Sequence, residues 1–358
     1  MNILKVKSAI RKRKECRNYK KIILEKAKKL KTVRKLTNAQ KKEIQDFYKD
    51  IIGREISLYS HEYFYSRTGV FSKDYIPSDL YYCDILPKAN LQSMKPAFCD
   101  KNMCDIIFAN EKQPRTILKN MNGYYYLKGE PVSFDGAVAG CQNIEKAIIK
   151  PSRLSKGEGV QCIKVEDGIV KSLNITFADL LKKYNKDFII QECVRQHEKM
   201  SALNPTSVNT LRILSYRSDM EVLIIYSVVR IGRLGAVIDN QSSGGISATI
   251  DDNGRLGKYA FGGVRDNNIE KTDTGIQIDG YQLPSYDKAI EMVKRLHLNL
   301  PFFDIIGWDI AIDEVGDPVL IEFNTRPGLS QSAFGSGMGK YTERILRELW
   351  PKKNTLFG

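Results

Sequence analysis

The chain has 358 residues, of which 42% are hydrophobic and 27% are charged, and its formal net charge is +14. Residues 1–42 contain 17 Lys and Arg but only two acids, Glu15 and Glu25, so this arm carries +15 and the other 316 residues together carry −1. Because the excess of basic residues is confined to the arm, the composition argues against a body whose whole surface coats nucleic acid.

Apolar runs and cysteine usage exclude further classes of protein. The longest apolar run, residues 222–229, is interrupted by Ser227 and is far shorter than the roughly 18 residues that a membrane-spanning helix needs. The basic N-terminus lacks the continuous apolar core of a secretory signal. Seven cysteines without a C-x-x-C pair are typical of neither a disulfide framework nor a zinc site. We therefore expect a cytoplasmic protein with reduced thiols.

The arm, residues 1–42, has the pattern of a basic amphipathic helix. Apolar residues recur at helical spacing, and Lys and Arg occupy most positions between them. The apolar positions are Tyr19, Ile22, Ile23, Ala27, Leu30 and Val33. Such a helix packs on the body or binds an anionic membrane surface, where each Lys or Arg contributes on the order of 1 kcal/mol. Nucleic acid is a third partner to consider, and the neutral body argues against it.

Residues 43–110 are predicted to form a small N-terminal cap domain of mixed α/β structure. The stretch is rich in Tyr and Phe, as at Tyr81 and Tyr82, and Pro77 and Pro87 mark turns. It contains no motif that points to a particular chemistry.

From residue 111 onward, short strand-like apolar runs alternate with Gly-rich turns, and the clearest helical pattern spans residues 286–297. The strand-like runs are residues 116–118, 124–127, 147–149, 160–165, 188–190, 211–216, 222–231, 305–312 and 318–323. Because helices are few between them, we expect an α+β fold with antiparallel sheets rather than a regular βαβ succession. We expect two lobes, residues 111–200 and residues 201–350.

A basic loop follows the apolar strand at residues 147–149. Lys150 and Pro151 lead into a Ser- and Gly-rich loop that returns into a strand at Val160. Backbone N–H groups of such a loop can face phosphate oxygens, and glycines allow a close approach. The segment matches neither the P-loop nor the Rossmann pattern. Taken alone, it is also compatible with a hairpin that has a basic turn.

Three oxygen-bearing side chains lie on two apolar strands near the C-terminus. Asp309 is on one strand, and Glu322 and Asn324 are on the next. Residues i and i+2 of a strand share a face, so Glu322 and Asn324 point together and Asp309 can face them. Burying two carboxylates without a cation is costly, so the pattern favours a Mg²⁺ site that nucleotide phosphates complete. The alternative is a surface hairpin whose acids face water.

In chain order, seven short segments resemble the ATP-grasp superfamily, and most closely its sugar-transfer-associated branch. The resemblance covers roughly residues 110–335. The segments are residues 117–120, the Lys150 loop, and residues 191–194, 209–213, 239–240 with 244–245, 307–309 and 321–328. The resemblance implies an ATP-grasp fold in which two α+β lobes clasp ATP, while the arm and most of the cap domain lie outside the motifs.

The resemblance assigns ATP-binding residues in the first lobe. Lys119 and Lys150 are similar to the pair that contacts the nucleotide phosphates. The lid over the phosphates would include Ser152, Ser155, Gly157 and Gly159. The hinge that reads the adenine edge would be Gln191, Glu192, Cys193 and Val194. Glu198, or His197 beside it, falls where similar enzymes hold the ribose hydroxyls.

The resemblance also assigns residues of the second lobe. Arg212 matches an arginine that binds phosphate or acylphosphate, a bidentate role that Lys cannot fill. The Mg²⁺ ligands would be Asp309, Glu322 and Asn324. Asn240 lies where a polar residue supports the phosphates or the acceptor, and Arg230 and Arg326 are candidates for an anionic substrate.

These assignments imply an ATP- and Mg²⁺-dependent carboxylate–amine ligase that acts through an acylphosphate, with Lys150 and Arg212 neutralising charge. We expect its substrates to be an amino acid or similar group and a cell-envelope sugar, polysaccharide precursor or lipid-linked glycan at the inner face of the membrane. Two alternatives stay open: an ATP-grasp kinase of a sugar or polyol, and a non-catalytic nucleotide- or nucleic-acid-binding protein. The sequence specifies neither the substrates nor the oligomeric state.

Overall fold

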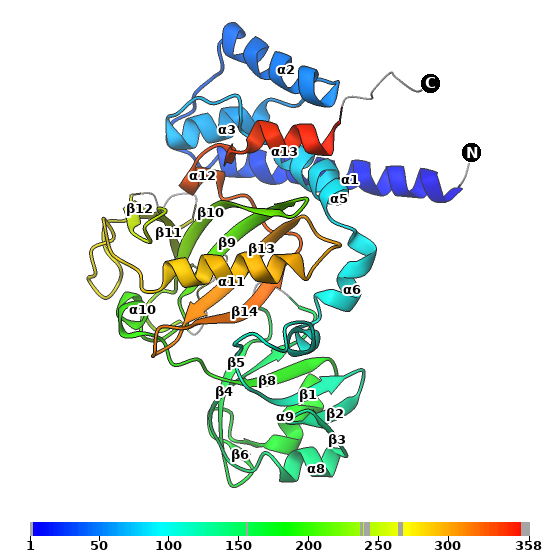
Figure 1. Cartoon of the computed structure of the whole chain (residues 1–358), viewed down its shortest axis with the longest axis vertical. Helices are drawn as coiled ribbons and strands as arrows, with labels where there is room; N and C mark the ends of the chain where they lie inside the picture. The colour runs from blue at the N-terminus through cyan, green and yellow to red at the C-terminus, as the bar shows by residue number, and fades with distance from the viewer. Residues whose placement is uncertain (1–2, 155–156, 237–238, 240–243, 264–267, 352–358) are drawn as a thin grey trace.

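The computed structural model describes residues 3–154, 157–236, 239, 244–263 and 268–351. Figure 1 shows three parts along the long axis: a helical region, a six-stranded sheet with helix α11 across it, and an eight-stranded sheet at the opposite end. In both sheets, neighbouring strands are antiparallel. The predicted α+β class with antiparallel sheets is confirmed.

The helical region contains the N-terminal third of the chain and a helix from the C-terminus. Its longer helices are α1 (Ile3–Ala27), α2 (Asn38–Ile52), α3 (Tyr59–Thr68) and α13 (Thr342–Leu349). Short turns follow α3: α4 (Ser78–Leu80), the π-helical turn η1 (Tyr81–Ile85), α5 (Leu86–Ala89), η2 (Gln92–Met94), α6 (Lys95–Phe98), η3 (Lys101–Met103) and α7 (Cys104–Ile107). Helix α13 packs on α2. None of the described helices is long and apolar enough to cross a membrane.

Residues 38–110, all of which are described, form helices and turns but no strand, so the expected α/β content of the cap is wrong. Local signals define the helices: Thr37 forms a capping box at the start of α2, and Gly53 and Gly69 end α2 and α3 in the left-handed conformation. Aromatic residues such as Tyr63 are buried on helices. Their strand propensity is overridden because the helical core buries them equally well.

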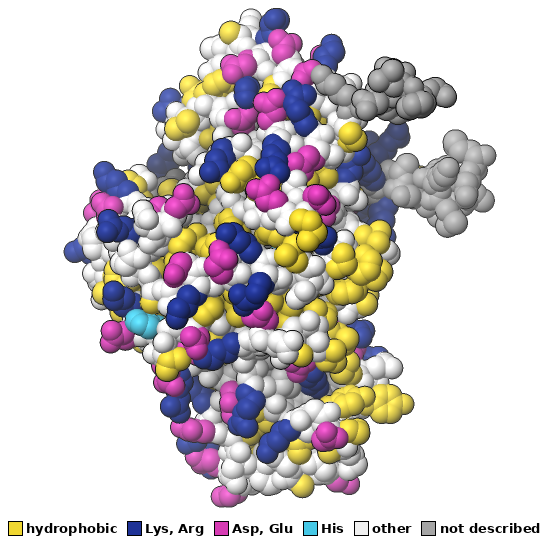
Figure 2. All heavy atoms as spheres, in the orientation of Figure 1, with side chains coloured by type: hydrophobic (Ala, Val, Ile, Leu, Met, Phe, Trp, Pro, Cys, Tyr) yellow, Lys and Arg dark blue, Asp and Glu magenta, His cyan; other side chains and the backbone are white. Residues whose placement is uncertain are grey.

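The arm helix α1 packs along α3, α4 and η1. Ile23 is buried in an aromatic cluster, and the Tyr19 ring stacks on Tyr82 with centroids 4.3 Å apart. The helix ends at Ala27, before the end of the apolar pattern, and the chain continues so that Leu36 joins the core of the helical region. Part of the apolar face of α1, at Tyr19 and Ile23, is therefore covered by the body, whereas Ile22 remains exposed. Over the rest of the visible surface, acidic and basic side chains are interspersed (Figure 2), as the near-neutral charge of the body predicts.

The first lobe is an eight-stranded sheet with order β3-β2-β1-β8-β4-β5-β6-β7. Its strands are β1 (Thr116–Met121), β2 (Tyr124–Leu127), β3 (Glu130–Val132), β4 (Ile144–Pro151), β5 (Gln161–Glu166), β6 (Ile169–Val170), β7 (Ile175–Thr176) and β8 (Phe188–Glu192). Helices α8 (Phe134–Ala139) and α9 (Phe177–Tyr184) pack on the sheet. Buried residues such as Leu180 and Phe188 form one core between helix and sheet.

The second lobe is a six-stranded sheet with order β12-β11-β10-β9-β13-β14. Its strands are β9 (Thr210–Ser218), β10 (Glu221–Ile231), β11 (Ile246–Ile250), β12 (Leu256–Phe261), β13 (Ile305–Ile312) and β14 (Pro318–Asn324). The remaining elements are α10 (Glu198–Leu203), α11 (Tyr286–Leu298), α12 (Gln331–Phe334) and β15 (Gly337–Lys340).

The two faces of the six-stranded sheet have different neighbours. On one face, alternate residues such as Leu211 and Trp308 pack with α11 in an apolar core. On the opposite face, Leu214 and Val228 pack with the helical region. Two residues before Leu214 on the same face, the sequence places Arg212, so this face changes from apolar to charged as it approaches the first lobe.

One buried side chain joins the helical region to this sheet. The Asn90 amide donates to the carbonyl oxygens of Ile305 at 2.8 Å and Thr325 at 2.6 Å, and its own oxygen accepts from the Ile305 N–H at 2.9 Å. Asn90 follows α5, while its partners lie at the start of β13 and just after β14. A single amide therefore links three segments that are distant in the sequence.

Candidate functional site

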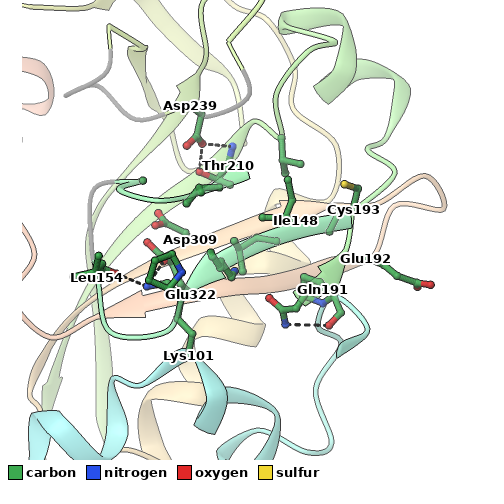
Figure 3. A pocket seen from close by; sticks show the side chains of 18 of the residues that line it. Lys101, Ile148, Leu154, Gln191, Glu192, Cys193, Thr210, Asp239, Asp309 and Glu322 are labelled. Carbon is green, nitrogen blue, oxygen red and sulfur yellow. Dashed lines mark hydrogen bonds and ion pairs between the residues drawn. The ribbon is translucent and has the colours of Figure 1, made fainter. Parts of the chain in front are cut away.

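A cavity of about 150 Å³ lies between the two sheets. Figure 3 shows that side chains from both lobes point into it. Its lining comprises Lys101, Pro114, Ile148, Lys150, Pro151, Leu154, Gly157, Glu158, Val160, Gln191, Glu192, Cys193, Val194, Val208, Thr210, Arg230, Asp239, Asp309, Ile321 and Glu322. The fold thus brings together residues from six of the seven segments that the sequence singles out. The exception is the segment at 117–120.

Lys150 lies near the end of β4, in the wall of the cavity. Its side chain is buried, and it forms no hydrogen bond or ion pair with any residue that the structure describes. Burial lowers the pKa of Lys150 below its ordinary value, and the nearby Glu322 carboxylate opposes that shift. A buried cation without a bound partner is costly, so this position is suited to an incoming anion.

Lys119 differs from Lys150, although both are predicted to contact phosphates. Lys119 is buried on β1 but does not line the cavity. Its ammonium donates to the carbonyl oxygen of Asn102 at 2.9 Å and forms an ion pair with Asp105. The charge of Lys119 is therefore already neutralised within the chain.

The loop after β4 is shaped by two glycines. Gly157 and Gly159 have φ values of +76° and +70°. A Cβ at position 159 would lie 2.8 Å from the Pro151 side chain, so this close approach requires glycine. The Ser152 hydroxyl is buried without a hydrogen-bond partner among the described residues. Ser155, the other predicted lid serine, lies outside the described residues.

The predicted hinge lies at the end of β8. The Gln191 amide donates to the carbonyl oxygen of Pro114 at 3.3 Å, and Glu192 forms an ion pair with Arg115 and points away from the cavity (Figure 3). Cys193 and Val194 line the cavity, and the Val194 N–H makes no backbone hydrogen bond with a described residue. This N–H is suited to the edge of a planar heterocycle.

Glu198, predicted to hold ribose, is not among the residues that line the cavity. It is the first residue of α10 and is exposed. The alternative, His197, accepts a hydrogen bond from the Lys199 N–H at 3.2 Å through Nδ1 and so caps α10. Neither side chain is brought into the cavity in this arrangement.

Arg212, Arg230 and Asp309 form a buried cluster at the second lobe. Arg212 Nε and Nη2 each lie 2.6 Å from an Asp309 oxygen, a bidentate pair across β9 and β13. Arg230 Nη1 lies 3.3 Å from Asp309 Oδ2. Burial alone would raise the pKa of Asp309, but the two guanidinium groups hold it below its ordinary value. The carboxylate is therefore ionised and fixed in place before any ligand binds.

Glu322 lies directly opposite Asp309 across β13 and β14, as the sequence predicts. The two residues are cross-strand neighbours, so their carboxyl groups lie on the same face of the sheet. Asn324 follows two residues later on β14, and its oxygen accepts from the Arg326 N–H at 2.8 Å. Two adjacent carboxyl groups suit a divalent cation, which would relieve their repulsion. The described residues contain no cluster of three His, Cys, Asp or Glu that could hold a metal, so Mg²⁺ here would take further oxygens from phosphates.

Two predicted catalytic residues are not part of this cluster. Arg326 faces the arm: its guanidinium forms an ion pair with Glu15 and donates to the Tyr19 hydroxyl at 3.1 Å. Asn240 lies outside the described residues. Of the predicted catalytic residues, Lys150 lines the cavity, and Arg212 is hydrogen-bonded to Asp309, which also lines it.

The cavity also contains residues that the sequence analysis does not assign. Asp239 accepts hydrogen bonds from the Thr210 N–H at 3.1 Å and from the Thr210 hydroxyl. Burial raises the pKa of Asp239 to about 6, although Arg230 opposes the shift. Lys101 donates to the Leu154 carbonyl oxygen at 2.6 Å. Thr210 and Asp239 fall within motif segments of the sequence, so they could have been assigned to the site. No motif marks Lys101 on η3.

Comparison with known proteins gives one family match. The model of the family described as sugar-transfer associated ATP-grasp matches residues 83–346. This match includes both sheets and most of the short helical turns that precede them. No curated protein matches the chain.

Solved structures resemble the chain at low identity. An L-amino acid ligase from Bacillus licheniformis is 12% identical with a TM-score of 0.41, over 70% of this chain and 48% of that chain, so the chain spans about half of its length. The ATP-grasp ligase PsnB, solved with a precursor variant, Mg and ADP, is 13% identical with a TM-score of 0.39, over 71% and 60%. A D-alanine–D-alanine ligase from Bacillus anthracis, solved with ATP, is 13% identical with a TM-score of 0.38, over 72% and 67%.

Proposed function

The chain belongs to the sugar-transfer associated ATP-grasp family, and we propose that it is an ATP-dependent ligase that joins a carboxylate to an amine. One observation carries the proposal. A buried lysine without a described partner, Lys150, and a pair of adjacent carboxyl groups, Asp309 and Glu322, line the same cavity. This combination suits a polyphosphate with a divalent cation, because Lys150 then gains an anionic partner and the two adjacent carboxyl groups share a cation.

Several residues of this chain fit ATP and Mg²⁺. Lys150 and the Ser152 hydroxyl would hold phosphate oxygens, and the Val194 N–H would bind the adenine edge. Asp309 and Glu322 would hold Mg²⁺. The carboxylate substrate would take the γ-phosphoryl group of ATP with release of ADP, and attack of the amine nitrogen on the resulting acylphosphate would form the amide with release of phosphate and a proton.

The side chains of the protein position the reacting groups and neutralise their negative charge. Arg212 acts as a positioning residue, because its bidentate contact orients Asp309 toward Glu322. Arg230 and Lys101 line the cavity and add positive charge where a carboxylate and a phosphoryl group would approach each other. No nucleophilic side chain is needed for this chemistry.

We further propose that one substrate is a cell-envelope sugar or polysaccharide precursor and that the other is an amino acid or a similar small molecule. The family description as sugar-transfer associated supports the sugar. The enzyme would then work in the cytoplasm.

The arm supports a proposal about location. Its apolar face is partly covered by the body, and most Lys and Arg of α1 remain exposed, as at Lys20 and Lys21. This exposed face would place the enzyme at an anionic membrane surface through charge alone. Cosedimentation with vesicles that contain phosphatidylserine tests this, and binding that persists after removal of residues 1–35 would contradict it.

Release of ADP, measured over a matrix of carboxylates and amines, tests the ligase. We expect release only when both are present, together with an amide product. The Glu322→Gln variant should lose turnover by about 1,000-fold, because a metal contributes several kcal/mol to such transition states. The Glu314→Gln variant, altered in the exposed turn after β13, is the matched control.

Other outcomes separate the alternatives. A stable phosphoester formed without any amine would identify a kinase. ADP release that is indifferent to every carboxylate and amine would contradict the ligase. Full turnover by Glu322→Gln would remove the metal assignment.

A further inference from the structure

Helix α1 of the arm has a defined register on the π-helical turn η1. Lys12 forms an ion pair with Asp84 at 2.6 Å, and the Tyr19 ring stacks on Tyr82 with an angle of 9° between the ring planes. Residues 12 and 19 are seven positions apart, so they lie on the same face of the helix. Turns of the π-helical type occur frequently at functional sites. The same face of α1 also reaches past η1 to the second lobe.

Beyond η1, this face of α1 contacts Arg326, which lies two residues after the end of β14. The Arg326 guanidinium forms an ion pair with Glu15 and donates to the Tyr19 hydroxyl at 3.1 Å. It also lies over the Tyr82 ring, 5.5 Å from the ring centroid, which allows a cation–π interaction. We call these four residues the Arg326 cluster. The cluster joins the arm, η1 and the segment after β14 at one point.

Glu15 differs from Glu25, the other acid of the arm. The Glu15 side chain is 37% exposed and directs its carboxylate at Arg326, whereas that of Glu25 is 56% exposed and lies 3.9 Å from Lys21 of the same helix. Residues 1–42 contain 17 Lys and Arg, so an acid here weakens any attraction of the arm to an anionic surface. The contact with Arg326 is the favourable interaction that Glu15 provides.

Arg326 is connected in turn to the strand that carries Glu322. Its backbone N–H donates to Asn324 Oδ1 at 2.8 Å, which fixes the direction of the Asn324 side chain. Asn324 is the last residue of β14 and follows Glu322 by two positions, so both side chains lie on the same face. The next residues pack directly on β13, because a Cβ at Gly307 would lie 2.8 Å from the Pro327 side chain. The position of the guanidinium therefore constrains the chain beside the two carboxyl groups of the cavity.

The family match does not account for this connection. It covers residues 83–346, whereas Glu15, Tyr19 and Tyr82 precede it. Arg326 and Asn324 lie within it. A motif segment of the second lobe is thus held by an element that lies outside the match.

We propose that the arm completes the catalytic site: Glu15 is a positioning residue that holds Arg326 and, through it, Asn324. The Asn324 oxygen is then oriented beside Asp309 and Glu322 before a divalent cation and nucleotide bind. Groups that orient a metal ligand from outside its coordination shell commonly change metal affinity by about 10- to 100-fold. The catalytic role rests on the proposed function of the cavity between the sheets, whereas the restraint on residues 322–328 does not.

Hydrogen exchange of the full chain without nucleotide tests the restraint. In the Glu15→Gln variant the guanidinium loses its ionic partner, and we expect the backbone of residues 322–328 to exchange several-fold faster. Glu25→Gln removes the other acid of the same helix, and this matched control should leave exchange in the segment unchanged. Both variants should keep a melting temperature close to that of the unaltered chain, because half-exposed ion pairs contribute little to stability.

Binding of Mn²⁺ in the presence of ADP, followed by electron paramagnetic resonance, tests the effect on the cation site. Glu15→Gln should weaken Mn²⁺ binding by about 10-fold, and Glu25→Gln should leave it unchanged. The double variant Glu15→Arg with Arg326→Glu restores an ion pair of opposite polarity and should recover most of the lost affinity. A general effect of the charge of the arm would appear equally in Glu25→Gln and would not be recovered by the double variant.

Two results would overturn the proposal. Equal exchange of residues 322–328 in the Glu15→Gln and Glu25→Gln variants would show that the arm does not restrain this segment. Faster exchange in Glu15→Gln with unchanged Mn²⁺ affinity would show that the restraint does not reach the cation site. Failure of the unaltered chain to bind Mn²⁺ and ADP would instead contradict the proposed function, and the exchange measurement would still decide whether the arm holds the segment.

Discussion

The two lobes present their cations to the central cavity in different ways. On the six-stranded sheet, Arg212 already makes two hydrogen bonds to Asp309, and Arg230 adds a third contact. On the eight-stranded sheet, Lys150 is buried without a described partner. The comparison teaches that Asp309 of the second lobe has cationic partners within the chain before ligand binds, whereas Lys150 of the first lobe gains its partner from an incoming anion.

The largest effect on stability should follow the loss of Arg212, the internal partner of Asp309 in the second lobe. In the Arg212→Met variant, Asp309 stays buried but loses its two hydrogen bonds to the guanidinium. We therefore expect the free energy of unfolding to fall by about 3–5 kcal/mol. The Lys150→Met variant removes a buried charge that has no described partner, so its stability should be unchanged or higher. Urea unfolding of both variants measures these changes in the free energy of unfolding. Equal losses in the two variants would contradict the contrast between the lobes.

Mild acid should also distinguish the regions. Burial lowers the pKa of His61, in the helical region, and of His297, under the six-stranded sheet, to about 4 each. In the unfolded chain the pKa of a histidine is near 6.5, so the unfolded chain binds more protons than the folded chain between pH 6.5 and 4. Stability therefore falls as the pH falls through this window, by about 3 kcal/mol per histidine when the fall is complete.

The eight-stranded sheet spans residues 116–192, which contain no histidine. Hydrogen exchange at pH 7 and pH 5 should therefore show a loss of protection in the helical region that contains His61, with little change intrinsic to the first lobe. In the second lobe, the raised pKa of Asp239 opposes the effect of His297, because the folded form of Asp239 binds a proton at a higher pH than its unfolded form does. A uniform loss over both lobes would mean that they unfold as a single unit.

The two lysines of the first lobe provide a smaller and more local test. Lys150→Met should reduce turnover by about 100-fold, the usual effect of losing one preorganised electrostatic contact. Lys119→Met should reduce it much less, because Asp105 already neutralises Lys119. Steady-state kinetics with ATP as the varied substrate gives both values. A larger loss of turnover in Lys119→Met than in Lys150→Met would contradict this expectation. It would mean that closure of the lobe replaces Asp105 by phosphate as the partner of Lys119.

The smallest effect concerns the loop after β4. Gly159→Ala introduces a Cβ at 2.8 Å from Pro151 and a left-handed residue, which costs about 1–2 kcal/mol. We expect the KM for ATP to rise by about 10-fold. Gly129→Ala is the matched control, because Gly129 also has a positive φ but its Cβ would meet nothing within 4 Å. Similar values for both variants would show that strain, not the contact with Pro151, limits the loop.

Much of the sheet structure follows from local pattern. The runs at residues 305–312 and 318–323 correspond to β13 and β14, and residues 286–297 correspond to α11. The opposition of Asp309 and Glu322 was predictable because side chains alternate along a strand and the two strands are consecutive.

What could not be predicted depends on contacts between distant segments. The pair of Arg212 with Asp309 requires β9 to lie beside β13, although 86 residues separate the two strands. The direction of Arg326 depends on where α1 packs, and a basic helix outside the motifs gives no signal for that. The position of Lys101 likewise depends on how a short helical turn meets the loop after β4.

The amide of Asn90 has a consequence for motion. To separate the helical region from the six-stranded sheet, the chain would have to break three hydrogen bonds at one buried group, each of which water could not replace until the core opened. These two parts should therefore travel as one rigid body. We therefore expect any opening of the central cleft to move the eight-stranded sheet, while the arm keeps a fixed position relative to Asp309 and Glu322.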